Sequence, residues 1–299
     1  MGVTPPLLIR GMFGLGDNIM QRPFVRAAAA RERVVYLQTP WPELYADLDN
    51  VRPVRTETLL RTQRRNERRS EVEWWTRPNM TRTAAISYGT ETLKRESIAA
   101  AMERALPLEG TAYRLDLPAT LPPAPSFETG GRPIALIRPV TERREWLNPA
   151  RNPRPEYVAE AARLLMRTHF VLVLADLLAG EEWSPAPLPP HHLALTSGEI
   201  ATPALLSLLR ESAVVVGGVG WIVPASIAAG TRAWIILGGN GAHNAPEKIT
   251  DPRQDLTRIG FARPDRLCMC DTKSHSCDKV ISDHAAAFRT WAAKQEVPL

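Results

Sequence analysis

Residues 211–250 carry the pattern that most restricts what this chain can fold into. Val214–Val216 is a β-branched run without polar residues, which is typical of a strand buried on both faces. A short helix at Trp221–Ala229, ended by Gly230, and a second apolar strand at Ala233–Leu237 follow. Each strand runs into a glycine loop, and adjacent parallel strands bring such loops together at the edge where open α/β sheets bind ligands. The loops are Gly217, Gly218, Val219 and Gly220 after the first strand, and Gly238, Gly239, Asn240 and Gly241 after the second.

The first glycine loop also opens a helix, whose free N–H groups and dipole favour a phosphate group. The alternative is a purely structural turn, in which the glycines only cap the helix. The sequence leaves both interpretations open.

Strand and helix patterns alternate along the rest of the chain, which predicts parallel sheets with helices on both faces. Residues 118–133 interrupt the alternation with five prolines and two glycines, a composition that excludes helix and sheet interiors. We therefore expect an α/β protein with two Rossmann-like domains, residues 1–120 and 134–280, joined by this linker and followed by a helix in residues 281–299. Two such domains place a cleft between them, a common site for small ligands. The other predicted strands are Leu7–Arg10, Val34–Gln38, Ala84–Tyr88, Ile134–Arg138, Phe170–Ala175 and His192–Thr196, and the other helices cover residues 17–31, 57–69, 92–105, 158–168 and 202–212.

Cysteine content and hydropathy restrict the cellular compartments in which we expect this protein. The three cysteines in 299 residues all lie between positions 268 and 277, which is not a disulfide framework. No apolar run reaches the roughly 18 residues of a membrane span, and the N-terminus lacks the basic and apolar regions of a signal peptide. We expect a cytoplasmic protein without a transmembrane segment.

The positive charge is concentrated in one segment. Residues 52–82 hold nine arginines and four glutamates, which equals the net charge of +5 of the whole chain. Helical spacing predicts one face that carries five of these arginines, and two tryptophans follow. Such a face can bind a polyanion, or it can be an ordinary solvated surface. The residues are Arg61, Arg64, Arg65, Arg68 and Arg69, with Trp74 and Trp75.

Asp17 follows a turn crowded with Gly11, Gly14 and Gly16 and precedes a predicted helix. A carboxylate there can cap the helix by accepting backbone N–H bonds. The alternative is a general base at the floor of the cleft.

Cys268, Cys270, His275 and Cys277 form the pattern C-x-C-x4-H-x-C. Three thiols and an imidazole match the ligand set of a structural zinc site, although the spacing is not that of a standard finger or ribbon. The alternative is a group of reduced thiols on a loop.

The chain resembles the heptosyltransferase-like glycosyltransferases of family 9, which have the GT-B fold. The resemblance covers nearly the whole chain. It rests on GLGDNIMQRPFVRAA at residues 14–28, similar to the family's Gly-Asp-x-x-x-x-x-Pro segment, and on the glycine turn, helix, strand and second glycine loop at residues 214–246.

This resemblance implies a nucleotide-diphosphate sugar as donor, bound by the C-terminal domain, and an acceptor bound by the N-terminal domain. It implies that Asp17 is the catalytic base and that Arg144, two residues before Trp146, contacts the donor phosphates. The adjacent Arg143 is a further candidate cation for the leaving diphosphate. An acidic residue after the next strand binds the donor ribose in the family, and Glu181, Glu182 or Asp176 matches it. The residues expected on the acceptor side are Gly14, Gly16, Arg61, Arg65, Arg68 and Trp74.

The chain departs from the family at Gly218-Val219-Gly220, where the family has an Asp-Thr-Gly turn. The missing carboxylate leaves the identity of the sugar open. The side chains next to the second glycine loop are candidates for replacement contacts: His243, Asn244, Glu247 and Lys248.

Glycosyl transfer needs a base for the acceptor hydroxyl and cations or N–H dipoles for the leaving diphosphate. Asp17, the arginines and the glycine loops meet these needs, so we expect a glycosyltransferase without a catalytic metal. The acceptor is expected to be polyanionic, either a nucleic acid with a hydroxylated base or a phosphorylated glycolipid core. The alternatives are a non-catalytic nucleotide-sugar or nucleic-acid binding protein on the same fold, and an epimerase.

Overall fold

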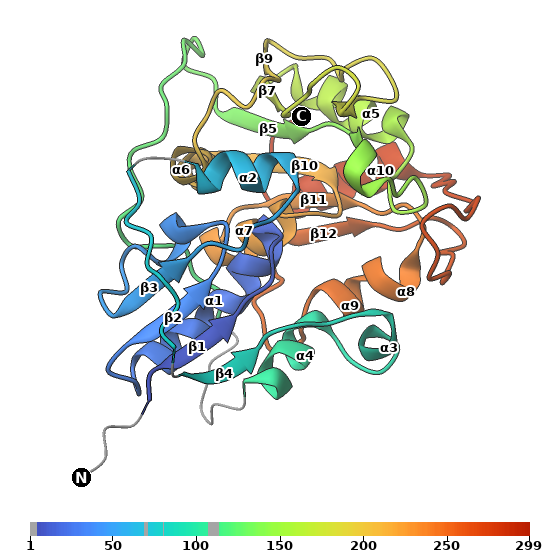
Figure 1. Ribbon diagram of the computed structural model, residues 1–299. Helices are drawn as coiled ribbons and strands as arrows, with labels where there is room; N and C mark the ends of the chain where they lie inside the picture. Colours follow the sequence, from blue (N-terminus) through green and yellow to red (C-terminus); the bar gives the residue numbers. More distant parts are fainter. Residues whose placement is uncertain (1–4, 69–70, 80, 107–113) are drawn as a thin grey trace.

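The computed structural model describes residues 5–68, 71–79, 81–106 and 114–299. It contains two parallel sheets whose carboxyl edges face one another (Figure 1). The first sheet has the order β3-β2-β1-β4, and the second has the order β12-β11-β10-β5-β7-β9. The strands of the first are β1 Leu7–Arg10, β2 Val35–Gln38, β3 Val51–Val54 and β4 Arg82–Ala85. Those of the second are β5 Ile134–Arg138, β7 Phe170–Leu174, β9 Leu193–Leu195, β10 Val214–Gly218, β11 Ala233–Ile236 and β12 Ile259–Ala262.

Helices connect the strands, and a short antiparallel pair, β6 Glu142–Arg143 with β8 Glu182–Trp183, lies outside both sheets. The longer helices are α1 Leu15–Ala29, α4 Ile98–Ala105, α5 Pro155–Leu165, α6 Thr202–Glu211, α7 Ile222–Ala229 and α10 His284–Lys294. The shorter ones are η1 Pro42–Tyr45, α2 Arg61–Glu67, α3 Thr90–Leu93, η2 Arg144–Trp146, α8 Gly241–Asn244 and α9 Pro246–Ile249. Gly230 has φ +66° and ends α7, as its position in the sequence predicts.

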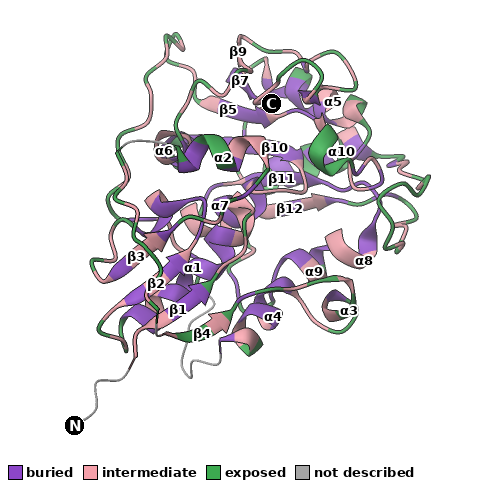
Figure 2. Ribbon diagram, viewed as in Figure 1, coloured by how far each residue is buried: buried purple, intermediate pink, exposed green. Residues whose placement is uncertain are grey.

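The inner strands of the second sheet, β5, β7, β10 and β11, are buried on both faces (Figure 2), because their successive side chains enter two different cores. Val215 packs with α6 and α7, whereas its neighbours Val214 and Val216 pack with α5 and α10. The core on the α7 side continues into the first sheet through α1. This continuous core fixes how the two halves of the chain meet.

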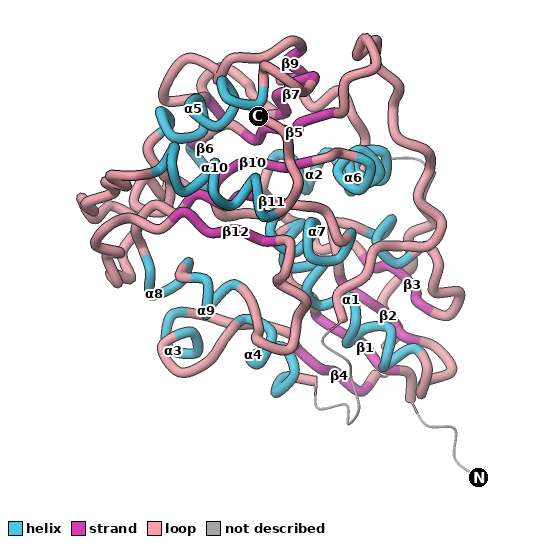
Figure 3. Tube along the Cα trace, turned by 180° about the vertical axis from the view of Figure 1, so that it is seen from behind, coloured by secondary structure: helices cyan, strands magenta, loops and turns pink. Residues whose placement is uncertain are grey.

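Each sheet reverses its strand order at one point, between β1 and β4 in the first and between β5 and β10 in the second. Ligands of open α/β sheets bind at the carboxyl ends of the strands that flank such a point. Helix α1, which follows β1, packs against α7, which follows β10 (Figure 3). The two reversal points therefore lie opposite one another.

The expected α/β architecture of two Rossmann-like sheets is confirmed. Two edge strands, β3 and β12, were not predicted from the sequence. β3 contains Pro53, which an edge strand tolerates because its N–H side needs no partner. β12 contains Gly260, where Trp234 and Trp291 fill the space that a side chain would take. The predicted helix at 92–105 is divided into α3 and α4, with Ser97 capping α4. Arg69 lies outside the described residues.

Candidate functional site

Asp17 and Tyr88 lie at the reversal point of the first sheet. Asp17 is in the first turn of α1, after β1, and Tyr88 follows β4. The Tyr88 hydroxyl donates a hydrogen bond of 2.6 Å to Asp17 Oδ1. The carboxylate also accepts a hydrogen bond from the backbone N–H of Gly14, the N-cap residue of α1, which has no side chain of its own to cap the helix. Asp17 thus forms the half of a capping box that reaches back to the start of the helix.

The surroundings of Asp17 suit a proton acceptor. Burial raises the pKa of Asp17, while the Tyr88 hydrogen bond and the charge of Arg151 partly oppose this shift. Burial also raises the pKa of Tyr88 above its ordinary value, so the phenol stays a donor. A carboxylate whose pKa is moved towards neutrality accepts protons more strongly than an exposed aspartate.

Arg151 and the first glycine loop lie at the reversal point of the second sheet. Arg151 follows β5 in the chain, and its Nη2 donates a 2.7 Å hydrogen bond to the Val219 carbonyl. A side chain on Gly218 would meet the Pro153 ring at 3.0 Å, so the glycine lets the two loops come together. The Nε of Arg151 is buried and has no hydrogen-bond partner among the described residues. A cation with an unpaired buried donor, at the start of a helix, is a group suited to a phosphate.

The two reversal points touch at Gly16. A side chain at Gly16 would approach the Cα of Trp221 to 3.1 Å and the ring of Pro224 to 3.4 Å. Gly16 therefore permits α1 to meet the start of α7, which no side chain caps. This contact brings Asp17 from one half near Arg151 from the other.

A second connection between the halves is made by charged groups. Arg61 Nη1 contacts Asp176 Oδ1 at 3.1 Å, Arg61 Nη2 contacts Glu182 Oε2 at 3.3 Å, and Arg65 Nη2 contacts Asp176 Oδ2 at 3.0 Å. The backbone N–H of Arg61 also donates to Glu145. Two arginines expected at the acceptor are thus bound to carboxylates of the second half.

The arginines of α2 do not act as one basic face. Arg61 and Arg65 point to the second half, whereas Arg64 and Arg68 line a hollow of about 370 Å³ in the first half. The expectation of one continuous face fails because the second half covers one side of this helix. Two further arginines stack on the tryptophans: Arg55 over Trp74 at 5.3 Å and Arg52 over Trp75 at 4.8 Å.

The acidic residues expected at the donor ribose are all paired. Glu182 is 3% exposed and contacts Arg61, Arg138 and Arg143, so it is an internal ion-pair partner. The exposed Arg144 is paired with Glu181 at 3.0 Å. The structure joins neither Arg143 nor Arg144 to Asp17 by a contact among the described residues.

The second glycine loop is engaged within its own half. Asn244 Nδ2 donates to the carbonyl and the side-chain oxygen of Asn240. Burial lowers the pKa of His243, whose Nε2 has no partner among the described atoms. A side chain on Gly239 would overlap Cys277 Sγ, so this glycine makes room for the cysteine segment.

Tyr88 and Arg151 were not identified from the sequence. Arg151 is one of several arginines in residues 138–154, and no local pattern distinguishes it. Tyr88 falls within the predicted strand of residues 84–88, but β4 ends at Ala85, which puts Tyr88 at the carboxyl edge of the sheet. The usable signal was topological, because both residues follow a strand at a reversal point.

No protein-family model matches this sequence, and no curated protein matches it either. Solved structures do match. The bacterial iron-containing dodecameric glycosyltransferase TibC from enterotoxigenic E. coli H10407 superposes with a TM-score of 0.65 at 13% identity, over 99% of this chain and 77% of that one. The glycosyl transferase family 9 protein from Veillonella parvula DSM 2008 gives 0.61 at 8% identity, over 99% of both chains. The E. coli ADP-heptose lps heptosyltransferase II gives 0.55 at 14% identity, over 97% of this chain and 99% of that one. These likenesses show that the chain has the GT-B fold.

Proposed function

We propose that this protein is a glycosyltransferase that moves a sugar from a nucleotide-diphosphate sugar to an acceptor hydroxyl. The observation that carries the proposal is the meeting of Asp17 and Arg151, a desolvated carboxylate and a cation with an unpaired donor, at the facing reversal points. The GT-B fold supports it, and one of the structures that share this fold is the heptosyltransferase TibC in complex with ADP-D-beta-D-heptose.

In the proposed reaction Asp17 accepts the proton of the acceptor hydroxyl while the oxygen of that hydroxyl forms a bond to the sugar carbon. The bond from that carbon to the diphosphate oxygen breaks, and the nucleotide diphosphate leaves with the electron pair. Arg151 and the first N–H groups of α7 stabilise the charge on the departing oxygen. The Tyr88 hydrogen bond holds Asp17 in one orientation.

The proposed reaction uses no catalytic metal, since Arg151 and the start of α7 meet the charge of the leaving group. The chain has one Asp-x-Asp sequence, Asp47-Leu48-Asp49, a motif that can hold a metal. Asp47 instead accepts two hydrogen bonds from the Arg22 guanidinium, at 2.9 Å from Nη1 and 2.7 Å from Nη2. Within the described residues, it belongs to no cluster of three or more potential metal ligands.

Arg151 and Arg144 are alternative candidates for binding the donor phosphates, and substitutions can distinguish them. Replacing Arg151 by Met should weaken the binding of a nucleoside diphosphate at least about tenfold, because a charge-assisted bond to phosphate is lost. Arg144→Met is the matched control for a phosphate site at Arg151, since Arg144 is exposed and paired with Glu181. Calorimetry with ADP, GDP, UDP and dTDP measures both variants. An effect of Arg144→Met alone would place the phosphates at Arg144, as the family resemblance implies.

The same panel, supplied as nucleotide sugars, tests the whole proposal. Release of nucleoside diphosphate that depends on Asp17 is expected, slowly by hydrolysis of the donor alone and faster with an acceptor. Binding without any turnover would indicate a non-catalytic nucleotide-sugar binding protein. Mass spectrometry of a co-purified nucleotide would identify the base.

No helix among the described residues has the length and apolarity to cross a membrane.

For the acceptor we propose a polyanion bound by the first half, held by Arg64 and Arg68 rather than by the paired Arg61 and Arg65. Arg64 and Arg68 are exposed, and among the described residues neither forms an ion pair. Single-stranded nucleic acid and a phosphorylated glycolipid core both supply phosphates. Duplex DNA would need a flipped nucleotide for its base to reach Asp17.

A gel-shift series across salt concentrations tests the nucleic-acid version. Binding should weaken with salt, and the double variant Arg64→Gln, Arg68→Gln should flatten the slope by up to about two phosphate contacts. The variant Arg163→Gln, Arg167→Gln removes the same charge from the C-terminal half, near the end of α5, and should keep the slope. No binding at low salt, or an unchanged slope in the first variant, would discard the nucleic acid and leave the glycolipid.

A further inference from the structure

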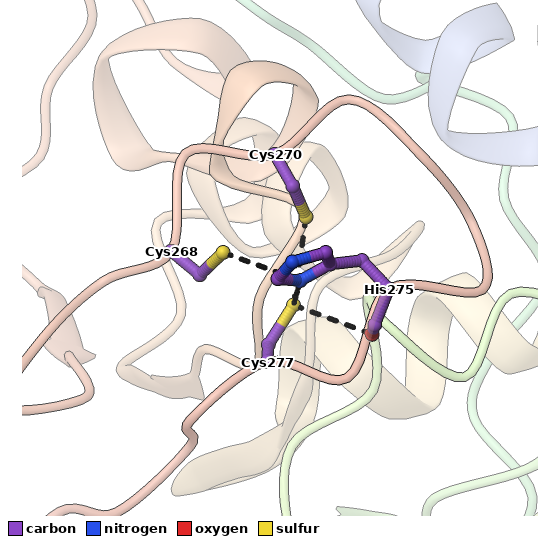
Figure 4. A group of neighbouring side chains, drawn as sticks. All are labelled: Cys268, Cys270, His275 and Cys277. Atoms are coloured by element: carbon purple, nitrogen blue, oxygen red, sulfur yellow. Dashed lines mark hydrogen bonds between the residues drawn. The ribbon is translucent and has the colours of Figure 1, made fainter.

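Four side chains converge in the segment that follows β12. Cys268, Cys270, His275 and Cys277 direct their sulfur and nitrogen atoms to one point (Figure 4). His275 Nδ1 lies 3.5 Å from Cys268 Sγ and 3.4 Å from Cys277 Sγ, and Cys270 Sγ lies 3.5 Å from Cys277 Sγ. All four ligand atoms lie within 4.8 Å of one another.

The three short separations, of 3.4 to 3.5 Å, are close to those of ligands around a metal ion. A tetrahedral ion with metal–sulfur bonds of about 2.3 Å and metal–nitrogen bonds of about 2.0 Å separates its ligand atoms by roughly 3.5 to 3.8 Å. A disulfide would require about 2.05 Å between sulfurs. All three cysteines are free and half-buried.

We propose that Cys268, Cys270, His275 and Cys277 bind one tetrahedral zinc or ferrous ion, and that this ion fixes residues 263–283 against the loops of the C-terminal half. Thiolate and imidazole ligands select soft or borderline metals of this kind over magnesium and calcium. The metal site stands whether or not the protein transfers a sugar.

The segment needs such a cross-link. Residues 263–283 contain no helix or strand in the structure. A structureless stretch of about twenty residues is unusual in a compact domain unless something ties it down. A metal with four ligands within ten residues would supply that tie.

One side of the segment holds the second glycine loop. The N–H groups of Gly241 and Ala242 donate to the carbonyls of Cys268 and Cys270, at 2.8 and 3.3 Å. A Cβ on Gly239 would overlap Cys277 Sγ, so this position admits only a glycine while the cysteine stays in place. Two ligand residues thus hold the loop through their own backbone.

The other side of the segment holds the loop that carries Arg151. Ala150 N–H donates to the Lys273 carbonyl at 3.0 Å, and Lys279 Nζ donates to the Pro149 carbonyl at 2.6 Å. The ammonium of Lys273 and the guanidinium of Arg151 each lie about 5 Å from the ring of Trp146. The proposed ion would therefore hold the loop of Arg151 in position without contacting Arg151 itself.

Elemental analysis of protein purified without chelators or metal-affinity resin is the first test. We expect about one zinc or iron per chain, with iron distinguished by its thiolate charge-transfer absorption. Cys268→Ser and His275→Ala should lose most of the metal. Ser274→Ala, an exposed neighbour of His275 that offers no ligand here, should retain it.

Hydrogen exchange separates a structural metal from an incidental one. Removing the metal with a chelator should lower the melting temperature by at least about 5 °C and speed exchange in residues 148–152 and 238–242. Gly239→Ala should reduce the metal content, since the added methyl displaces Cys277. Folded, reduced protein that binds neither added zinc nor added ferrous ion would overturn the proposal. Metal removal that leaves melting and exchange unchanged would overturn the structural role.

Discussion

Asp17→Asn is expected to lower turnover by at least about a hundredfold while the affinity for the nucleotide donor stays unchanged. Asparagine keeps the shape of the side chain but cannot accept a proton from the acceptor hydroxyl, and loss of a general base typically costs 10²–10⁴ in rate. Steady-state kinetics and donor calorimetry on the same preparation measure the two quantities. Turnover near that of the parent protein would exclude Asp17 as the base.

The variant should not lose stability. The pKa of Asp17 is higher in the folded protein than in the unfolded chain, because burial disfavours the ionised form. The folded state therefore binds more protons between the two pKa values, and stability falls as pH rises through that window. The neutral asparagine lacks this penalty, so Asp17→Asn should melt at or above the temperature of the parent protein at pH 7. Activity lost through unfolding would instead lower the melting temperature.

The pH profile provides a second test of the same base. The acid limb of kcat/KM should lie above the ordinary range of an aspartate, since the pKa of Asp17 is raised. Tyr88→Phe removes a hydrogen bond to the ionised carboxylate, so the limb should move to still higher pH. Tyr36→Phe, a change in β2 of a tyrosine that has no hydrogen bond to Asp17 among the described residues, is the control and should leave the limb in place.

Glu182→Ala is expected to reduce the free energy of unfolding by about 3–5 kcal/mol, because it leaves buried cations without their counter-charge. Three arginines, Arg61, Arg138 and Arg143, share this one carboxylate. Burial already lowers the pKa of Arg138, and the charge of Glu182 is the largest effect that opposes this shift. Removing the charge therefore exposes the cost of burying the guanidinium.

The adjacent residue provides a matched control. Glu181 is 33% exposed, and within the described part of the chain it pairs with Arg144 alone, so Glu181→Ala should change stability by no more than about 1 kcal/mol. Urea titrations of both variants give the comparison. Equal midpoints for the two would show that the Glu182 cluster is no more important than a surface ion pair.

The sequence was sufficient to predict the elements whose signal is local. The strand at Ile134–Arg138 has the predicted bounds, and the apolar runs, the glycine turns and the parallel arrangement of the second sheet follow from patterns within a few residues. Edge strands were missed because a proline or a glycine interrupts the pattern, and only the neighbouring strand or helix makes such a residue acceptable there.

The candidate site could be predicted only at residues that a local sequence pattern distinguishes. Asp17 follows a glycine turn, and the metal-ligand residues stand close together in sequence. The position of Arg151 depends on the loop that follows β5 in the second sheet. The position of Tyr88 depends on where β4 ends in the first sheet. Helical periodicity placed Arg61 and Arg65 on one face of α2 but contained no information about the carboxylates opposite them.

On the proposed function, dividing the reacting groups between two sheets would protect the donor from water. A nucleotide sugar held by Arg151 and α7 alone would have no carboxylate beside it to activate a water molecule, because Asp17 belongs to the other half. The packed contact of α1 with α7 at Gly16 is what brings the base near Arg151, and that contact leaves little room for solvent. On the proposed function, this packed joint between the halves would thus favour transfer to the acceptor over hydrolysis of the donor, by excluding water from the place where base and donor meet.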